Sequence, residues 1–371
     1  MEWFESLLLG VIQGVTEFLP VSSDGHLAIT QQAFAWLTGH RRTGKEDLFF
    51  DIMLHVGTLC AILFHYRKEI IEGARGFLTD AKARPADLDT DSGDPAADKT
   101  VRPGFDRASI FRVGLLAAVA TSPLVPFALL FKKKLEEAFQ STTAAGVGFL
   151  ITASALLIVT WRMRGQDGRK DAATMTWLDA LLIGIAQTAA PLPGVSRSGM
   201  TIAAALLLGL TRTWSVGFSL LIAVPAICGA AVFELKDAVK DPAALGLTPD
   251  RIGQTLAATV LAGIVGYFAI LWLIQVVRGG RLWYFSVYLI GLGSLVLALS
   301  AISGGSPDAG PAKSLDRTAL GILPRPHPGG VRGRAPFTLA RPDATGPRPP
   351  GLRAGAASRA GKASPLRPLL G

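Results

Sequence analysis

The sequence has little charge and almost no cysteine. Charged residues make up 18% of the 371 residues, half of all residues are apolar, and the mean hydropathy is +0.39. A soluble domain carries about 25% charged residues, so this composition argues against a soluble enzyme and predicts a membrane protein with several spans. The two cysteines, Cys60 and Cys228, lie far apart inside apolar runs, which excludes a disulfide scaffold. We expect both to be small buried apolar residues.

Several familiar motifs are also missing. Neither a Walker loop nor a Rossmann glycine pattern occurs, which argues against adenine-nucleotide binding. The first apolar segment has no basic stretch before it and no small-residue cleavage site after it, so we expect it not to be a signal peptide.

Most of the net charge of +9 lies in the last segment of the chain. Residues 305–371 hold nine Arg and two Lys against three Asp, together with 12 of the 23 prolines. Such a segment cannot bury enough apolar surface to offset its ordering entropy. We therefore expect residues 304–371 to be a disordered basic tail, residues 1–303 to be the membrane domain, and nucleic acid not to be a partner.

Six stretches are long and apolar enough to cross about 30 Å of hydrocarbon. They are 48–66, 109–131, 143–161, 215–233, 253–277 and 282–302. Two more apolar regions are interrupted: 6–19 and 26–37 flank a break at Pro20–Gly25, and 176–190 and 200–210 flank a break at Pro191–Gly199. Each half is too short to span, which is typical of a re-entrant hairpin whose irregular backbone is buried in protein or lines a wet cavity.

The two interrupted regions resemble each other. Gly10-Val11-Ile12-Gln13 aligns with Gly184-Ile185-Ala186-Gln187 at an offset of 174, and at the same offset Val21-Ser22 aligns with Val195-Ser196. Three spans lie between the copies, so the second copy is inverted. The predicted fold is an all-α polytopic membrane protein with six transmembrane helices and two re-entrant helical hairpins, arranged as inverted repeats over about 1–161 and 176–303. In such folds the site lies near the midplane, where the broken helices meet.

Lys and Arg are unevenly divided between the two sides of this plan. Fifteen fall on the side of the 67–107 and 162–176 loops, and nine on the other. The positive-inside rule places the richer side in the cytoplasm. We therefore expect a multi-pass protein of the bacterial inner membrane whose first hairpin, tail and active site face the periplasm, although the basic tail opposes this orientation.

Polar residues gather at both breaks. Gln13 and Glu17 are four residues apart on one helix face, and Ser22, Ser23 and His26 follow within one turn of the first break. An acid, a histidine and two hydroxyls are costly at membrane depth, so they indicate a functional site.

The second break supplies the opposite charge. Arg197 stands between Ser196 and Ser198 before a helix start, and Gly194 and Gly199 let backbone N–H groups approach a ligand. The planar fork of arginine suits phosphate oxygens, and helix N-termini favour anions. Together the two breaks predict a site that handles phosphate.

The segments GVIQGVTEFLPVSSDGH (10–26) and PGVSRSGMT (193–201) resemble the two signature motifs of the undecaprenyl-diphosphatase family, of the bacitracin-resistance type. The resemblance covers about residues 1–303. It implies a phosphatase that converts undecaprenyl diphosphate to undecaprenyl phosphate and inorganic phosphate, which recycles the lipid carrier for peptidoglycan synthesis and gives bacitracin resistance. It also implies a divalent cation, Mg²⁺ or Ca²⁺.

The resemblance assigns roles to single residues. Glu17, Ser23, His26 and Arg197 are the catalytic candidates, with His26 as acid or base and Arg197 as phosphate clamp. Gln13 and Glu17 are the metal ligands. The remaining expected contacts to the substrate come from Gln13, Ser22, Gly194, Ser196, Ser198 and Thr201. One departure from the family motif is Asp24, where Thr or Ser is more usual.

The residues leave some alternatives open. Ser23 can be a covalent nucleophile, or water activated by His26 or Glu17 can attack directly. A polyprenyl-phosphate transporter or flippase would use the same inverted-repeat plan. Asp51 and His55, four apart on the first full span, are partners that support the site residues, a contact to the lipid headgroup, or a structural polar pair. The expected partners are the polyprenyl diphosphate, membrane lipids and a second copy in a homodimer.

Overall fold

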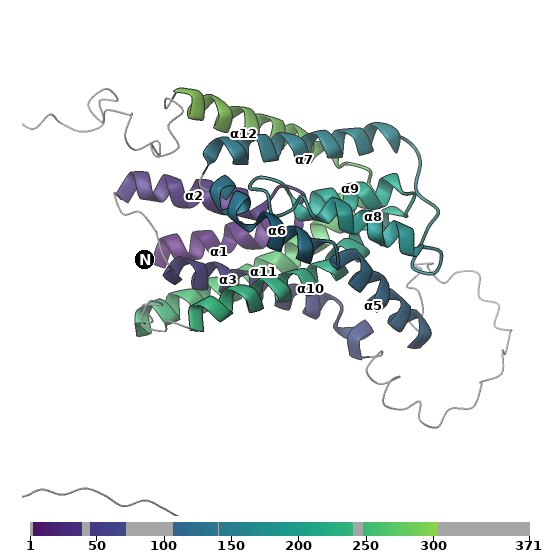
Figure 1. The fold of residues 1–371 in the computed structure, drawn as a ribbon, viewed down its shortest axis with the longest axis horizontal. Helices are drawn as coiled ribbons and strands as arrows, with labels where there is room; N and C mark the ends of the chain where they lie inside the picture. Colours follow the sequence, from purple (N-terminus) through teal and green to yellow (C-terminus); the bar gives the residue numbers. More distant parts are fainter. Residues whose placement is uncertain (1–2, 39–44, 72–106, 140, 240–247, 303–371) are drawn as a thin grey trace, which may run out of the picture. The chain divides into compact units, whose positions relative to one another are not determined.

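The described part of the protein is built from α-helices. This computed structural model describes residues 3–38, 45–71, 107–139, 141–239 and 248–302, and the predicted tail lies outside them. Within these ranges the β-type pairing is a single bridge between Lys170 and Leu210. The helices belong to one compact unit, Met1–Leu320, whereas a second unit, Gly321–Gly371, is not described. In chain order (Figure 1) they are α1 (Trp3–Phe18), α2 (Ser23–Thr38), α3 (Lys45–His65), α5 (Arg107–Thr121), α6 (Leu124–Phe139), α7 (Thr142–Arg162), α8 (Trp177–Gln187), α9 (Arg197–Leu207), α10 (Arg212–Val239), α11 (Pro249–Arg278) and α12 (Trp283–Ile302).

Among the described residues, five helical stretches are long and apolar enough to cross a membrane. They are Ile110–Leu135, Thr142–Arg162, Arg212–Val232, Pro249–Arg278 and Trp283–Ile302. The sixth predicted span, 48–66, coincides with the shorter apolar stretch Phe49–His65 of α3. The prediction of an all-helical protein with several helices of membrane-spanning length is therefore confirmed.

The two predicted breaks separate short helices. In the first region α1 ends at Phe18 and α2 begins at Ser23. In the second, α8 ends at Gln187 and α9 begins at Arg197. The prolines at both places explain the interruption, because proline lacks the N–H that a helix interior requires.

One predicted span is not a single helix. The stretch predicted as 109–131 contains the end of α5 at Thr121 and the start of α6 at Leu124. The hydroxyls of Thr121 and Ser122 donate to the carbonyls of Ala117 and Val119 (2.8 and 2.9 Å), and Pro123 follows directly. The side-chain hydrogen bonds and the proline end the helix locally, although the surrounding hydropathy is uniform.

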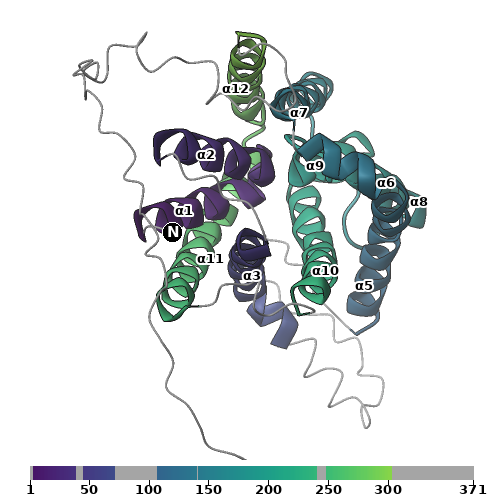
Figure 2. The ribbon, with the colours of Figure 1, turned by 60° about the vertical axis from the view of Figure 1, so that its left-hand side comes forward.

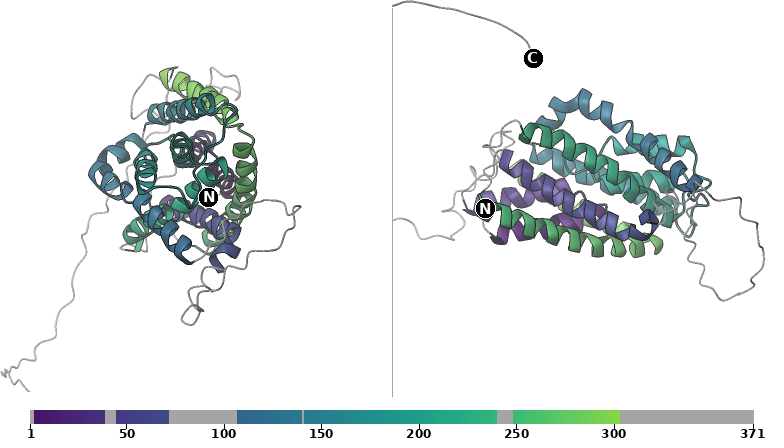
Figure 3. Two further views of the ribbon diagram at one scale, coloured as in Figure 1. Left: turned by 90° about the vertical axis from the view of Figure 1, so that its right-hand side faces the viewer. Right: turned by 90° about the horizontal axis from the view of Figure 1, so that it is seen from below.

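Glycine allows the closest helix contacts. A Cβ on Gly10 would lie 2.6 Å from the carbonyl oxygen of Ala258 on α11, and one on Gly184 would lie 2.3 Å from that of Ala120 on α5. Small residues let backbones approach where lipid offers no hydrophobic drive for association. Figure 2 shows the result: α1 lies beside α11 on one side of the unit, α8 lies beside α5 on the other, and α3 and α10 lie between them. Figure 3 shows α3 running along α11, where Gly57 makes an equally close approach.

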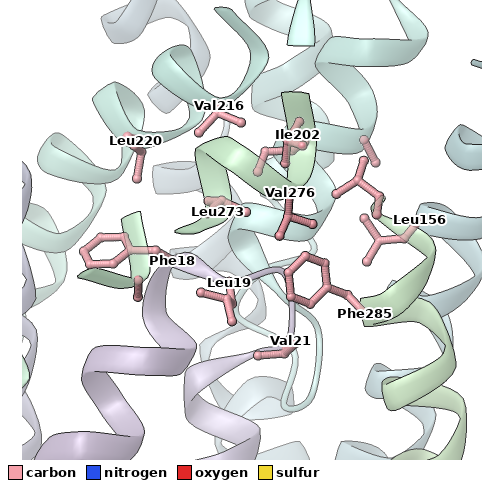
Figure 4. Packing of buried hydrophobic residues seen from close by; sticks show 14 of the residues in the cluster. Phe18, Leu19, Val21, Leu156, Ile202, Val216, Leu220, Leu273, Val276 and Phe285 are labelled. Carbon is pink, nitrogen blue, oxygen red and sulfur yellow. The ribbon is translucent and has the colours of Figure 1, made fainter. Parts of the chain in front are cut away.

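A buried apolar cluster holds the first break in place. Phe18, Leu19 and Val21 are at most 4% exposed and pack with side chains from α7 and α9 to α12 (Figure 4). The labelled members from those helices are Leu156, Ile202, Val216, Leu220, Leu273, Val276 and Phe285. In a lipid environment the stabilisation from such side chains comes from van der Waals packing between them. These contacts hold the residues on both sides of Pro20 against the other helices of the unit.

Arginines bind the loops at the end where α7 finishes and α10 begins. Arg212 donates to the carbonyls of Met163, Gln166 and Arg278 at 2.8–3.3 Å. Arg112 of α5 donates to the carbonyls of Ala172 and Met175. A guanidinium has five N–H donors, so one arginine can satisfy several loop carbonyls.

Large apolar side chains are exposed on the outer surface of the unit. Phe111, Trp161 and Phe268 are examples. Such exposure suits a surface covered by lipid. Cys60 and Cys228 are also exposed, so the expectation that both are buried was wrong. Hydropathy cannot tell a core face from a lipid face, because both are apolar.

Candidate active site

The two helix breaks meet inside the unit. The Ser198 hydroxyl donates to the carbonyl of Leu19 at 3.0 Å. A Cβ on Gly25 would lie 3.1 Å from the Cα of Gly194, which shows how closely the two backbones approach. From this meeting point α2 and α9 extend in opposite directions (Figure 1). Both helices therefore point their partly positive N-termini toward the same place.

Glu17 is the centre of the contacts between the breaks. Its side chain is 5% exposed, and Oε1 accepts from the Arg197 guanidinium at 2.7 Å. Oε2 accepts from Gln13 Nε2 at 3.0 Å and from Ser23 Oγ at 2.8 Å. The shared helix face predicted for Gln13 and Glu17 is confirmed by this direct contact. One carboxylate thus connects α1, the start of α2 and the start of α9.

The first break contains a strained residue. Ser22 has φ +71°, a left-handed conformation that is uncommon for a residue other than glycine. Its hydroxyl accepts from the N–H of Gly25 at 3.4 Å and so serves the first turn of α2, as a capping serine does. Strain of this kind costs about 1–3 kcal/mol and is found at functional sites. Here it turns the chain so that Ser23 faces Glu17.

The second break depends on glycine and on α7. Gly194 has φ +80°, and a Cβ there would lie 2.0 Å from the carbonyl oxygen of Ala145. The Ser196 N–H donates to Thr152 Oγ1 at 2.9 Å, and the Ser196 hydroxyl caps α9 by accepting from the N–H of Gly199 at 3.1 Å. These contacts place Arg197 at the first position of α9.

Three hydroxyls predicted to bind substrate are buried and bonded within the protein. Ser196 and Ser198 contact each other at 3.1 Å, and Ser198 also donates to Leu19. Thr201 pairs with Ser219 of α10 at 2.6 Å. In this structure these hydroxyls hold the second break together, whereas Arg197 and Ser23 contact Glu17.

His26 lies one turn into α2, and both of its ring nitrogens have partners. Nδ1 is 2.7 Å from the carbonyl oxygen of Ser22, and Nε2 is 2.6 Å from the hydroxyl of Tyr288 on α12. The ring also meets Phe149 edge-on at 5.4 Å. No contact between His26 and the Glu17 carboxylate occurs among the described hydrogen bonds and ion pairs.

His55 approaches Glu17 from α3. Its Nδ1 donates to the carbonyl of Asp51 at 2.8 Å, so Nε2 is the atom that faces the site. Nε2 lies 3.6 Å from Glu17 Oε2 and 3.9 Å from Asp24 Oδ1. The carboxylate of Asp51 instead accepts from Gln31 at 3.3 Å. Of the two α3 candidates, the structure brings His55 to Glu17 and leaves Asp51 with α2.

The site beside Glu17 offers a hard cation suitable oxygen ligands, but only a few of them. Gln13 Oε1 is buried without a hydrogen-bond partner in the described structure, and amide and carboxylate oxygens are ligands that Mg²⁺ and Ca²⁺ accept. The described residues contain no group of three or more His, Cys, Asp or Glu that could hold a metal ion. Mg²⁺ typically uses one or two carboxylates together with substrate phosphates, and this donor set fits that mode.

A family model described as "Bacitracin resistance protein BacA" matches residues 6–295. The chain belongs to this family. The relatives include an undecaprenyl-diphosphatase of Carboxydothermus hydrogenoformans, 37% identical over 305 residues, which is 81% of this chain and 98% of the relative. Undecaprenyl-diphosphatases of Alkaliphilus metalliredigens and Desulfatibacillum aliphaticivorans are 36% and 37% identical over 304 and 302 residues, covering 81% of this chain and 100% of each relative.

The match to the BacA family includes the whole candidate site, from Gln13 on α1 to Tyr288 on α12, and the resemblance inferred from the two motifs is confirmed. Sequence reasoning missed Tyr288, since it lies inside an apolar span far from both motifs. Its polar hydroxyl within a predicted span was the one signal that pointed to it. One interpretation of His55 was a supporting partner of the site residues, and the structure places its Nε2 3.6 Å from Glu17 Oε2.

Proposed function

We propose that the protein hydrolyses undecaprenyl diphosphate to undecaprenyl phosphate and inorganic phosphate, and so recycles the lipid carrier for cell-wall synthesis and gives bacitracin resistance. The observation that carries this proposal is the Glu17–Arg197 pair, which joins the two breaks beside Ser23. The names of the relatives support the same reaction.

The site offers an anion several stabilising groups. The N-termini of α2 and α9 each carry a partial positive charge, and free N–H groups in the first turn can donate to phosphate. Arg197 can leave the carboxylate for the diphosphate, because phosphate and carboxylate oxygens suit the same guanidinium fork. Transfer of a phosphoryl group needs this kind of charge stabilisation more than covalent help.

Ser23 is the nucleophile that the geometry supports best. Its hydroxyl already donates to Glu17 at 2.8 Å, so the carboxylate can take the proton as Oγ attacks the terminal phosphorus. The bond from that phosphorus to the bridging oxygen breaks, and undecaprenyl phosphate leaves. Water then attacks the phosphoserine, which releases inorganic phosphate and returns a proton to Oγ. Attack by water on the diphosphate with His26 as base has less support, since both nitrogens of that ring are engaged.

A divalent cation, Mg²⁺ or Ca²⁺, would be held by Gln13 and Glu17 together with the diphosphate. Bound there, it would neutralise charge on the phosphates. Gln13 would contribute Oε1, which has no other partner among the described groups.

We also propose the finer membrane arrangement of six spans and two re-entrant hairpins as inverted repeats. Gly10 and Gly184, which correspond at the offset of 174, both lie where an added Cβ would strike the backbone of a partner helix, α11 and α5 respectively. In this plan α5 and α6 form one broken span. The loops near Arg212 face the cytoplasm of the inner membrane, and the site opens to the periplasm. Formation of a homodimer stays a prediction, which measurement of the particle mass in detergent would test.

The direct test is release of inorganic phosphate from undecaprenyl diphosphate by purified protein in detergent, with and without chelator. Micelles have no gradient and no second compartment, so a flippase would release no phosphate there. We expect release that the chelator suppresses. Gln13→Ala should lower the rate and its response to added Mg²⁺, while Gln187→Ala, its counterpart bonded to the Ala120 carbonyl, should change neither. Wild-type protein that binds the lipid without releasing phosphate would refute the proposal.

A further inference from the structure

His26 is held in one tautomer by two elements far apart in the chain. A carbonyl only accepts hydrogen bonds, so the Nδ1 atom 2.7 Å from the Ser22 carbonyl carries the proton. In the neutral ring Nε2 is then the acceptor, and the Tyr288 hydroxyl donates to it at 2.6 Å. The two residues that set this tautomer lie far apart in the chain: Ser22 directly precedes α2, whereas Tyr288 lies on α12, 262 positions after His26.

Packing restrains the orientation of the same ring. The Tyr288 ring lies nearly parallel to the imidazole, with centroids 5.7 Å apart and an interplanar angle of 15°. Phe149 of α7 meets the imidazole edge-on, with an interplanar angle of 69°. A ring that is hydrogen-bonded at both nitrogens and packed by two aromatic rings cannot rotate without breaking several contacts.

The second break has no counterpart to this arrangement. The residue at the offset of 174 from His26 is Met200, although Gly25 corresponds to Gly199 directly before it. The hydrogen-bonded imidazole therefore belongs to one copy of the two related segments. A feature that serves only the repeated backbone would need no imidazole, because Met200 occupies the same place at the start of α9.

We propose that Tyr288 is a positioning residue for His26. Its hydroxyl fixes the Nδ1–H tautomer and stays hydrogen-bonded to Nε2 until substrate or water displaces it. This inference rests on the proposed phosphatase function and adds a residue of α12 to the functional residues of the site. Tyr288 is half exposed (48%), so protein does not enclose it, and in this proposal a phosphate oxygen or a water molecule competes for its hydroxyl. His26 can then exchange a proton at Nε2 in two ways only. Either the Tyr288 hydroxyl first leaves that nitrogen, or the proton is transferred through the Tyr288 hydroxyl.

The first test is kinetic. Tyr288→Phe keeps the aromatic ring and removes the hydroxyl. We expect kcat to fall on the order of 10- to 100-fold, with KM nearly unchanged. This fall in kcat lies between the effect of losing one hydrogen bond and the effect of losing acid–base catalysis. In a His26→Gln background the same substitution should cause no further loss. Tyr284→Phe is the matched control, because Tyr284 lies one turn earlier on α12 and its ring contacts Trp283.

The second test does not depend on turnover. In protein labelled with ¹⁵N-histidine, the His26 nitrogens, assigned with the His26→Gln variant, should show the Nδ1–H tautomer. In Tyr288→Phe the Nε2 resonance should move toward the value of an unbonded nitrogen, and in Tyr284→Phe it should stay. An unchanged resonance, or an equal loss of kcat in the His26→Gln background, would overturn the inference. Failure of the proposed function appears differently, as absence of phosphate release by the wild-type protein.

Discussion

Neutralising Glu17 should leave Arg197 as an unpaired charge inside the protein. The two groups are 2.7 Å apart, and their side chains are only 5% and 16% exposed. At an effective dielectric constant of about 20, unit charges about 4 Å apart attract each other by about 4 kcal/mol. Removing one partner of a buried pair costs about 3–5 kcal/mol, because the other charge stays desolvated. We expect Glu17→Gln to lower the free energy of unfolding by this amount.

The double variant decides whether the pair itself is responsible. Arg197→Gln should destabilise the protein as Glu17→Gln does, since it leaves the carboxylate without its cation. Glu17→Gln combined with Arg197→Gln removes both charges and keeps two side chains that can bond to each other. Its stability should approach that of the wild-type protein, as for other buried pairs replaced as a unit. All three variants should release no measurable phosphate.

Denaturant unfolding in detergent, followed by tryptophan fluorescence, measures these stabilities beside phosphate release. Asp179→Asn is the matched control, because Asp179 pairs with Lys170 at 2.8 Å at the start of α8, in a loop-side contact outside the candidate site. It should lower stability and leave the rate per folded molecule unchanged. Single variants as stable as wild type, or a double variant that loses the sum of both effects, would refute the reasoning. Normal turnover in Glu17→Gln would remove Glu17 from the chemistry.

Four further outcomes follow from the structure. Gly194→Ala should prevent folding into the active form, because φ is +80° and the new Cβ would strike a backbone oxygen, whereas Gly291→Ala, where the space is open, should be tolerated in expression and activity assays. Ser23→Ala should lose nearly all turnover, and rapid quench of wild-type protein should trap a phosphoserine; a residual rate without that species would instead support attack by water. His55→Ala should lower kcat, and His55→Gln, which can still donate near Glu17, should recover most of it; equal losses would show that donation is not the role of His55. Truncation after Ser303 should leave phosphate release in membranes unchanged, because the tail lies beyond the family match; an inserted but inactive truncation would contradict this.

Local patterns in the sequence were sufficient to predict several features of this protein. Low charge and long apolar runs predicted a membrane protein, and the prolines predicted both breaks. Helical spacing placed Gln13 beside Glu17, and the structure contains that hydrogen bond. These inferences succeed because helix geometry and hydropathy depend on residues only a few positions apart.

Hydropathy alone failed where apolar environments had to be told apart. The predicted span 109–131 lies within the span-length stretch Ile110–Leu135, but hydropathy did not predict that α5 ends at Thr121 inside it, where hydroxyl-to-carbonyl bonds and Pro123 act within an evenly apolar run. The exposure of Cys60 was misjudged for a related reason, since a lipid-facing position is as apolar as a core position.

The partners within the site were decided by tertiary structure. Arg197 meets Glu17 across 180 residues, and Tyr288 meets His26 across 262. No local spacing encodes such contacts. They exist because glycines such as Gly10 and Gly184 let helices from distant parts of the chain approach closely, which brings polar groups from distant segments within hydrogen-bonding distance.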